Sequence, residues 1–234
     1  MRTTRVIAEQ DRGGAFFGRR KGHKLRDNHA RLLAEVLPRL RLPAGTDKLA
    51  PAGLFPHPVR EVWLEIGFGG GEHLLARARE NPDIGFIGCE PFVNGMAKLL
   101  AGVEEHAIAN LRVWDDDATL VLPRLPEASI GRVFVLYPDP WPKRRHRKRR
   151  FIGEETLAAL ARVMRPGAEL RFATDIDDYA AWALARIDRS GLFAWRAERA
   201  DDWRRPWTGW PGTRYEAKAL REGRLPMYLT FVRR

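Results

Sequence analysis

Residues 62–71 read Val-Trp-Leu-Glu-Ile-Gly-Phe-Gly-Gly-Gly, and this stretch identifies the type of fold. Its apolar half, 62–66, predicts a buried strand, and its glycine half predicts a turn that leads into a helix over about 72–79. Because glycine has no Cβ, a ligand can approach the backbone of such a turn closely. The spacing G-x-G-x-G departs from the dinucleotide fingerprint G-x-G-x-x-G, and the turn lacks the Lys-Ser/Thr of a P-loop. The turn therefore predicts an α/β fold without identifying the ligand.

Strands and helices alternate along the rest of the chain. The remaining predicted elements are strands at 84–89, 111–114, 132–137 and 168–173, and helices at 94–106, 154–164 and 177–189. Two closing apolar runs, 192–195 and 227–232, are expected to pair as strands on one edge. The alternation is typical of an α/β fold, here a mostly parallel seven-stranded sheet with helices on both faces.

The N-terminal quarter differs from the rest in composition. Residues 1–24 are polar and basic and predict a flexible arm, and 27–38 predicts a helix with one apolar face. A proline-rich connection follows at 43–58. We therefore divide the chain into an N-terminal region, 1–58, and a folded domain, 59–234.

Charge and composition narrow the class of partner. The chain has 41 Lys and Arg against 30 Asp and Glu, a net charge of +11, and a pI of about 10.4. Such a surplus favours polyanions such as nucleic acid. Cys89 is the only cysteine and lies in an apolar run, so we expect a buried thiol and no intrachain disulfide. Since the histidines lack metal-ligand spacing and no bilayer-length or signal-like segment is present, we expect a cytoplasmic protein without a metal.

Carboxylates stand where four of the predicted strands end. Glu65 precedes the glycine turn, Glu90 ends the second strand, and Asp117 follows the third. Asp139 follows the fourth between two prolines, which fix their own φ and restrict the residues before them to extended backbone. The carboxyl ends of parallel strands form the ligand crevice of open α/β sheets, where Glu90 can accept from ribose hydroxyls and Asp117 from an adenine amino group. Singly, each is better explained as a surface charge or helix cap; together they favour a nucleoside-like ligand.

The segment after the fourth strand is strongly basic. Residues 137–143 read Tyr-Pro-Asp-Pro-Trp-Pro-Lys, and seven of the eight residues 143–150 are Lys or Arg. So dense a run repels itself, which favours a position beside a polyanion. A solvated charge run after a proline-rich turn is the alternative, and it is the commoner interpretation of such runs.

The glycine turn and the strand-end carboxylates resemble those of class I S-adenosylmethionine-dependent methyltransferases, which have a Rossmann-like fold. Three further elements, 138–143, Ala-Thr-Asp at 173–175 and Thr-Arg-Tyr-Glu at 213–216, are similar specifically to the bacterial tRNA (guanine-N7-)-methyltransferase family. The resemblance runs from about residue 16 to the C-terminus and is closest over 62–150. It implies methyl transfer from S-adenosylmethionine to N7 of the variable-loop guanine, usually position 46, of tRNA.

The resemblance also implies roles for individual residues. The implied S-adenosylmethionine-binding residues are Glu65, Gly67, Gly69, Gly71, Glu90, Asp117 and Asp139, of which Asp139 is also the implied catalytic residue. The implied substrate-binding residues are Lys143, Asp175, Thr213, Arg214, Tyr215 and Glu216, and the implied RNA-binding residues are Arg145, His146, Arg147, Lys148, Arg149 and Arg150. The chain departs from the family where Arg214 and Tyr215 replace frequent Lys and Phe, and where Pro91-Phe92 follows Glu90.

The implied chemistry agrees with the residue types. Guanine N7 has a free lone pair, so its methylation needs no strong general base. Asp139 or Glu216 can accept hydrogen bonds from N1–H and N2–H₂ of guanine, and a fixed carboxylate stabilises the cation that develops on the purine. Trp141 and Tyr215 are candidates to stack on the base, with ordinary core packing as the alternative.

Several residues, and the class of reaction, allow more than one interpretation. Asp175 either caps the next helix or contacts substrate, and the tryptophans at 203, 207 and 210 either cover the site or pack on the sheet. An amino methyltransferase shares the Asp-Pro element but normally without the following Trp, and a nicotinamide dehydrogenase has a different glycine spacing. An inactive RNA-binding module would keep the basic run and lose the crevice. We expect tRNA as the partner, and the sequence is compatible with a monomer.

Overall fold

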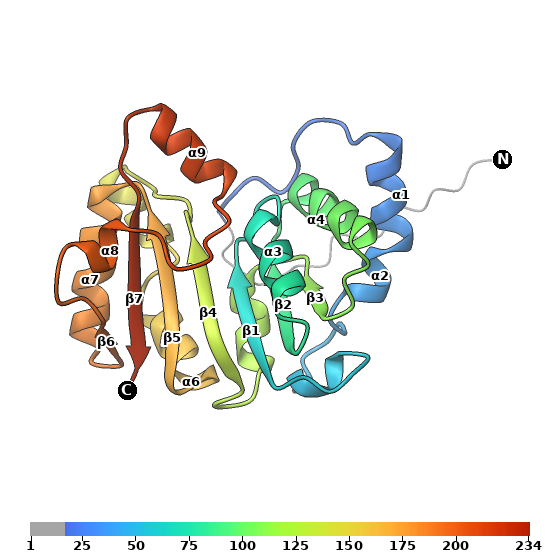
Figure 1. Cartoon of the computed structure of the whole chain (residues 1–234), viewed down its shortest axis with the longest axis horizontal. Helices are drawn as coiled ribbons and strands as arrows, with labels where there is room; N and C mark the ends of the chain where they lie inside the picture. Colours follow the sequence, from blue (N-terminus) through green and yellow to red (C-terminus); the bar gives the residue numbers. More distant parts are fainter. Residues whose placement is uncertain (1–16) are drawn as a thin grey trace.

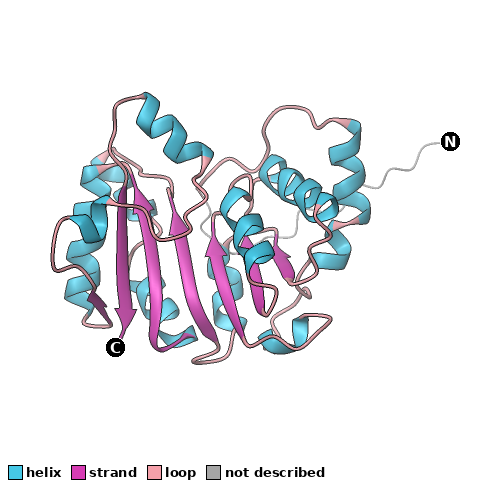
Figure 2. Ribbon diagram, in the orientation of Figure 1, coloured by secondary structure: helices cyan, strands magenta, loops and turns pink. Residues whose placement is uncertain are grey.

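The computed structural model describes residues 17–234, so the first 16 residues of the predicted basic arm lie outside the described part. Its centre is a seven-stranded sheet in the order β3-β2-β1-β4-β5-β7-β6 (Figure 1, Figure 2). The strands are β1 (Glu61–Ile66), β2 (Ile84–Cys89), β3 (Leu111–Trp114), β4 (Ile130–Leu136), β5 (Met164–Thr174), β6 (Phe193–Trp195) and β7 (Met227–Arg233). Strands β1 to β5 are parallel, while β7 pairs antiparallel with β5 and with β6. The predicted mostly parallel sheet and the pairing of the two closing strands at one edge are confirmed.

The strand bounds follow the apolar pattern closely, with one informative exception. The predicted strands at 84–89 and 111–114 have the observed bounds, and every residue of β2 is buried, as in a strand covered on both faces. Strand β5 begins at Met164, four residues earlier than predicted, because the chain passes through Pro166 and Gly167 without leaving the sheet. The register with β4 jumps there, from Ile130 opposite Met164 to Arg132 opposite Glu169, which marks a bulge.

Helices cover both faces of the sheet. The longer helices are α3 (Glu72–Glu80), α4 (Val93–Glu105), α6 (Glu154–Val163) and α7 (Asp177–Ser190), and shorter ones are α5 (Ala118–Val121) and the 3₁₀ segments η1 (Pro51–Leu54), η2 (Leu122–Arg124) and η3 (Arg144–Arg149). Successive strand residues point to opposite faces, so Leu64 packs in the core beneath α5, α6 and α7, while Trp63 and Phe134 pack in the core beneath α3 and α4.

The predicted N-terminal helix is divided in two. Helix α1 covers Asp27–Glu35 and α2 covers Leu37–Leu40, with Pro38 in the first turn of α2, where a missing amide hydrogen is tolerated. Leu32 of α1 is fully buried in the core that α4 shares. The Leu42 amide then donates to the Val113 carbonyl at 2.8 Å, so the segment from α1 onward packs on α4 and β3.

Two C-terminal helices were not predicted, namely α8 (Asp201–Arg204) and α9 (Arg214–Arg221). Helix α9 begins with a capping box in which the Thr213 side chain accepts from the Glu216 amide and the Glu216 side chain accepts from the Thr213 amide. Figure 1 shows α9 at the edge of the sheet where β1 and β4 end. Among the helices of residues 17–234, none combines the length and the apolar character needed to cross a membrane.

Candidate active site

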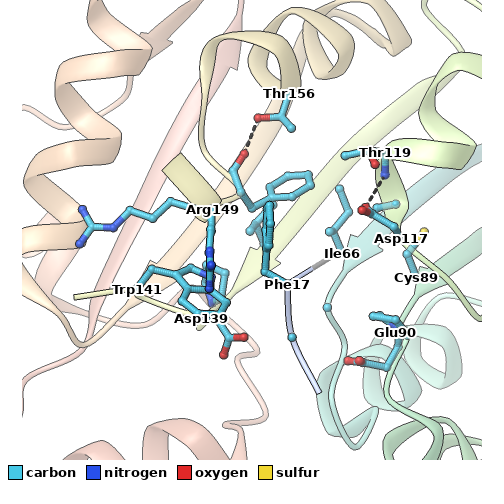
Figure 3. Close-up of a pocket in the computed structure, with 18 of the residues that line it drawn as sticks. Phe17, Ile66, Cys89, Glu90, Asp117, Thr119, Asp139, Trp141, Arg149 and Thr156 are labelled. Carbon is cyan, nitrogen blue, oxygen red and sulfur yellow. Dashed lines mark hydrogen bonds between the residues drawn. The ribbon is translucent and has the colours of Figure 1, made fainter. Parts of the chain in front are cut away.

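A cavity of about 510 Å³ opens where the parallel strands end (Figure 3). Its volume lies within the range of ordinary small-molecule pockets, roughly 300–1,000 Å³. The residues that line it at the strand ends include Ile66, Gly67, Cys89, Glu90, Asp117 and Asp139, and those contributed by other segments include Phe17, Trp141, Lys148, Arg149 and Tyr215. The fold thus brings Glu90, Asp117 and Asp139 around one cavity, as the sequence predicted.

The glycine turn needs glycine at its three alternate positions. Gly67, Gly69 and Gly71 have φ of 73°, 59° and 84°, a left-handed backbone that other residues rarely adopt. A Cβ on Gly67 would meet nothing within 4 Å, so the backbone there faces open space. A Cβ on Gly95, in the first turn of α4, would collide with the Gly69 carbonyl oxygen. The turn and α4 therefore approach each other at backbone distance.

Glu90 lies buried at the end of β2 and faces the glycine turn. Its carboxylate accepts hydrogen bonds from the Gly69 amide at 2.7 Å and the Phe92 amide at 2.9 Å. Burial raises the pKa of Glu90 to about 7, although both amides act to lower it. A carboxylate has about four lone pairs, so this group can accept further hydrogen bonds from a ligand.

Asp117 combines the two roles that the sequence left open. Its Oδ1 accepts from the Thr119 amide at 2.9 Å and caps α5, while its side chain also lines the cavity. The Trp114 indole donates to the Asp117 carbonyl at 2.9 Å and fixes the backbone after β3. Within residues 17–234 no hydrogen bond is made to Oδ2, so one oxygen remains for a ligand.

Glu65 lies apart from these carboxylates. Its side chain points to the face of the sheet that α3 covers. There its carboxylate pairs with His73 Nδ1 at 2.6 Å, and both side chains are buried. The His73 ring lies between Phe134 and Trp210, with ring centroids 4.7 Å and 5.1 Å away. Glu65 does not line the cavity, and its partner His73 carried no signal in the sequence.

The backbone after β4 is strained. Tyr137 and Trp141 have φ of 49° and 41°, although each precedes a proline. The predicted extended backbone before Pro138 is therefore wrong. The Tyr137 amide is still held by the Ala173 carbonyl at 2.8 Å in the β4–β5 pairing, so the chain turns sharply at this point. Left-handed non-glycine residues cost about 1–3 kcal/mol and cluster at functional sites.

Asp139 stands between these two strained residues. Figure 3 shows it beside Trp141 and Arg149, across the cavity from Glu90. Partial desolvation by the surrounding protein raises the pKa of Asp139. No group of residues 17–234 donates a hydrogen bond to its carboxylate, which lies exposed at the cavity wall. A fixed acceptor without a protein donor is available to a ligand.

The basic run divides into cations with protein partners and exposed cations. Arg150 is buried, pairs with Asp178, donates to the Pro140 carbonyl at 2.7 Å, and stacks on Tyr179 and Trp182 at 4.9 Å and 5.0 Å. Arg147 also pairs with Asp178, at 2.7 Å. Asp178 was not predicted as the partner of Arg150, because the two residues are 28 positions apart in the sequence.

Two of the remaining cations of the run lie at the cavity. Arg149 and Lys148 line it, and the Arg149 guanidinium carbon lies 5.0 Å from the Trp141 ring centre. His146 stacks edge-on against Trp141 with centroids 5.9 Å apart. Desolvation, as the largest cause, and the neighbouring cations together hold the pKa of His146 below its usual value. The exposed members of the run are Lys143, Arg144, Arg145 and Lys148.

Segment 213–216 forms the start of α9, with Thr213 as the N-cap. Glu216 accepts hydrogen bonds from Trp210 Nε1 at 2.7 Å and from the Tyr228 hydroxyl, so its carboxylate already has donors within the protein. Tyr215 instead lines the cavity, and its ring lies 2.9 Å from the position that a Cβ on Gly69 would take. The structure therefore brings Tyr215 to the cavity and directs Glu216 away from it.

Asp175 neither caps α7 nor lines the cavity. Its carboxylate pairs with Arg224 Nε at 2.6 Å. This ion pair was not predicted, because the two residues are 49 positions apart in the sequence. The tryptophans are used for packing: Trp203 contacts the core under α7, and Trp207 and Trp210 stack edge-on with each other and with Tyr228.

The cavity chemistry fits a nucleoside. Glu90 and Asp117 supply buried acceptors, Ile66 and Phe92 supply apolar surface, and the Gly67 backbone leaves room for close approach. No group of three His, Cys, Asp or Glu side chains between residues 17 and 234 is arranged to hold a metal ion.

Known proteins are similar to this chain over most of its length. Residues 59–228 match a family model described as a putative methyltransferase. A Mesorhizobium japonicum protein named tRNA (guanine-N(7)-)-methyltransferase is 57% identical over 94% of this chain and 95% of its own length. The Nitrobacter winogradskyi protein of the same name is 56% identical over 94% of this chain and 86% of its own length.

Solved structures share the fold at low sequence identity. The 16S rRNA methyltransferase KamB superposes with a TM-score of 0.51 and 19% identity, covering 75% of this chain and 89% of its own. The [4+2]-cyclase SpnF also gives 0.51, with 13% identity over 75% of this chain and 76% of its own. Their different activities mean that this likeness shows only the Rossmann-like fold. The family follows from the sequence matches: the chain belongs to the tRNA (guanine-N(7)-)-methyltransferase family.

Proposed function

We propose that this chain transfers a methyl group from S-adenosylmethionine to N7 of the variable-loop guanine, position 46, of tRNA. Two lines of support meet in this proposal. The relatives that share more than half of its residues are named for guanine-N7 methylation of tRNA. The cavity has nucleoside-binding acceptors on one side and Asp139, with its unused acceptor oxygens, on the other (Figure 3). In this proposal the reaction takes place in the cytoplasm.

The half of the cavity formed by β1, β2 and β3 binds the cofactor in this proposal. Glu90 accepts hydrogen bonds from the ribose hydroxyls, and Asp117 Oδ2 accepts from the adenine amino group. The turn at Gly67 lets the ligand lie against the backbone. When bound, S-adenosylmethionine supplies an electrophilic methyl group on a sulfonium. Glu65 does not contact the cofactor directly in this proposal, because its pairing with His73 keeps it out of the cavity.

Asp139 orients the base and is the observation that carries the proposal. Its exposed carboxylate can accept from both N1–H and N2–H₂ of guanine, whereas adenine presents an acceptor at N1 and is repelled. Glu216 does not share this task, because it does not line the cavity and Trp210 and Tyr228 hold its carboxylate elsewhere. Because N7 has a free lone pair, the protein needs to remove no proton, and alignment and charge stabilisation are its main contributions.

The tRNA backbone is bound by the exposed cations that follow Asp139. Lys143, Arg144 and Arg145 extend from the start of η3 into solvent, next to the cavity wall formed by Trp141. Exposed Lys and Arg bind phosphate by releasing counterions, and they position the nucleic acid without reading its sequence. Arg150 and Arg147 support this segment from the protein side through Asp178.

The test is the identity of the methylated nucleoside. Unmodified tRNA is incubated with the protein and S-adenosylmethionine, digested to nucleosides and analysed by mass spectrometry. The proposal predicts 7-methylguanosine. A methylated adenosine or cytidine would assign the chain to another base methyltransferase. Absence of any methylation, with retained tRNA binding, would assign it to an inactive RNA-binding protein.

A further inference from the structure

The described chain begins with a segment that crosses the cavity. We call residues 17–24 the strap. Phe17, Gly18 and Arg19 line the cavity, and Figure 3 shows Phe17 between Arg149 and Trp141 on one side and Ile66 on the other. The strap belongs to no helix or strand, so its position depends on side-chain and backbone contacts at its two ends.

One end of the strap is attached to the start of α4. The Val93 amide donates to the Arg20 carbonyl at 2.9 Å. The Asn94 side chain accepts from the Gly22 amide at 2.7 Å and donates to the His23 carbonyl at 2.9 Å. Arg20 adds an ion pair with Asp116, after β3, at 2.7 Å. These contacts fix the strap on the side of the cavity that holds Glu90 and Asp117.

The other end reaches the segment after β4. The Phe17 ring stands edge-on to the Trp141 ring, with centroids 6.5 Å apart. The Arg149 guanidinium carbon lies 4.8 Å from the centre of Phe17 and 5.0 Å from the centre of Trp141. A guanidinium within about 6 Å of an aromatic face is attracted by the ring. Arg149 therefore holds the strap to the Asp139 side of the cavity.

Phe17 forms a wall of the cavity without filling it. The cavity keeps its volume of about 510 Å³ with Phe17 in place, and Phe17 is 45% exposed. Its ring therefore covers the space in which a ligand fits. A cover attached on both sides is expected to slow the departure of a bound ligand.

Arg149 differs from the exposed members of the basic run. Its Nε is buried and has no hydrogen-bond partner among residues 17–234, a feature that it shares with Arg147, whereas Arg144 and Lys148 are exposed. The guanidinium is thus turned toward the chain's own rings. A phosphate contact would instead require its donors to face solvent.

We propose that Phe17, Trp141 and Arg149 form a clasp that holds the strap across the cavity and retains bound S-adenosylmethionine, with Arg149 as a positioning residue. The inference rests on the proposed function, because it takes the cavity ligand to be this cofactor. It also assigns Arg149 to holding the strap, whereas the family resemblance implies that Arg149 binds RNA.

The test measures how fast the product S-adenosylhomocysteine and the cofactor leave the protein in the absence of tRNA. Phe17→Ala and Arg149→Ala should each speed dissociation by about three- to tenfold, the equivalent of one or two cation–π contacts. Asn94→Ala opens the strap at its other end and should have the same effect. Arg149→Lys keeps a cation near the rings and should restore part of the retention. Melting temperatures check that each variant is folded.

The charge-matched control is Arg144→Ala. It should leave cofactor dissociation unchanged and flatten the dependence of log tRNA affinity on log salt, whereas Arg149→Ala should leave that slope unchanged. A flattened slope for Arg149→Ala, or wild-type dissociation in the Phe17 and Asn94 variants, would overturn this inference alone. Wild-type protein that binds neither ligand would overturn the proposed function and this inference together.

Discussion

The Gly69 amide donates a 2.7 Å hydrogen bond to the Glu90 carboxylate, and this bond joins the glycine turn after β1 to the end of β2. The same carboxylate is buried and has a pKa raised to about 7 by that burial. The bond explains how a group that resists ionisation is held in place for a ligand. It also makes the charge of Glu90 sensitive to pH in the physiological range.

The first prediction concerns the pH dependence of cofactor binding. Ribose hydroxyls donate to the ionised carboxylate of Glu90, so binding should favour its deprotonated form and release a proton. Affinity for S-adenosylmethionine should rise with pH up to about 7 and level off above it, with roughly a tenfold difference between about pH 6 and about pH 8. Calorimetry across this range measures the effect.

Glu90→Gln is the matched control for that experiment. It keeps the shape of the side chain but cannot titrate, so the pH dependence should disappear and affinity should fall by about 1–3 kcal/mol. A flat profile in the wild-type protein, or an unchanged profile in the variant, would show that Glu90 does not bind the ribose.

The second prediction concerns Asp139. Asp139→Asn keeps the size of the side chain and removes its negative charge, so methyl transfer should slow by roughly 10²-fold. Affinity for tRNA and for the cofactor should remain near wild type, because the phosphate and ribose contacts lie elsewhere. Single-turnover kinetics with saturating tRNA separate these quantities. Transfer at the wild-type rate would remove Asp139 from the chemistry.

The third prediction separates the exposed cations from the anchored one. Replacing Lys143, Arg144 and Arg145 together by Ala should weaken tRNA binding and reduce the salt slope by up to about 2–3 units, at about 0.7–0.9 per phosphate contact. Arg150→Ala should leave the slope unchanged. It should lower the free energy of unfolding by about 2–3 kcal/mol, because it removes buried hydrogen bonds and ring contacts.

Salt titrations of tRNA binding and urea denaturation distinguish the two outcomes. An unaltered slope in the triple variant would identify the run as solvated charge. A flattened slope for Arg150→Ala would contradict its position as a buried anchor.

The fourth prediction tests the close approach of α4 to the glycine turn. Gly95→Ala places a Cβ against the Gly69 carbonyl oxygen, which belongs to a fixed backbone, so it should destabilise the fold by about 2 kcal/mol and weaken cofactor binding. Gly102→Ala, in the same helix, has its three nearest contacts with the Leu75 side chain, which can rotate. It should change stability by less than about 1 kcal/mol. Equal effects in urea denaturation would contradict this packing.

The sheet could be predicted from the sequence because the signals that mark its strands are local. Runs such as 84–89 are apolar throughout, and glycine and polar residues mark their ends, so strand bounds need no tertiary knowledge. The positions of Glu90, Asp117 and Asp139 followed from the same rule, since the ends of parallel strands meet at one edge. The family resemblance added the chemistry.

The details that were missed depend on partners far away in the sequence. Arg150 pairs with Asp178, and Arg149 lies over the Phe17 ring. Neither partner is near the basic run in the sequence, so the different roles of the two arginines could not be predicted. Tyr137, which has a left-handed backbone, is bonded through its amide to Ala173 of β5, a strand that is distant in the sequence. Helix α9 alone had a local signal, the Thr-x-x-Glu capping box, that an otherwise polar segment obscured.

The most direct measurement uses tRNA in which one atom is changed. Two otherwise identical tRNAs carry at position 46 either guanine or 7-deazaguanine, in which a C–H replaces N7, and each is incubated with the protein and isotopically labelled S-adenosylmethionine. We predict one methyl group on the guanine-containing tRNA and none on the substituted one, with equal binding of both. Methyl incorporation into the substituted tRNA would contradict this prediction, because the accepting atom would then lie elsewhere.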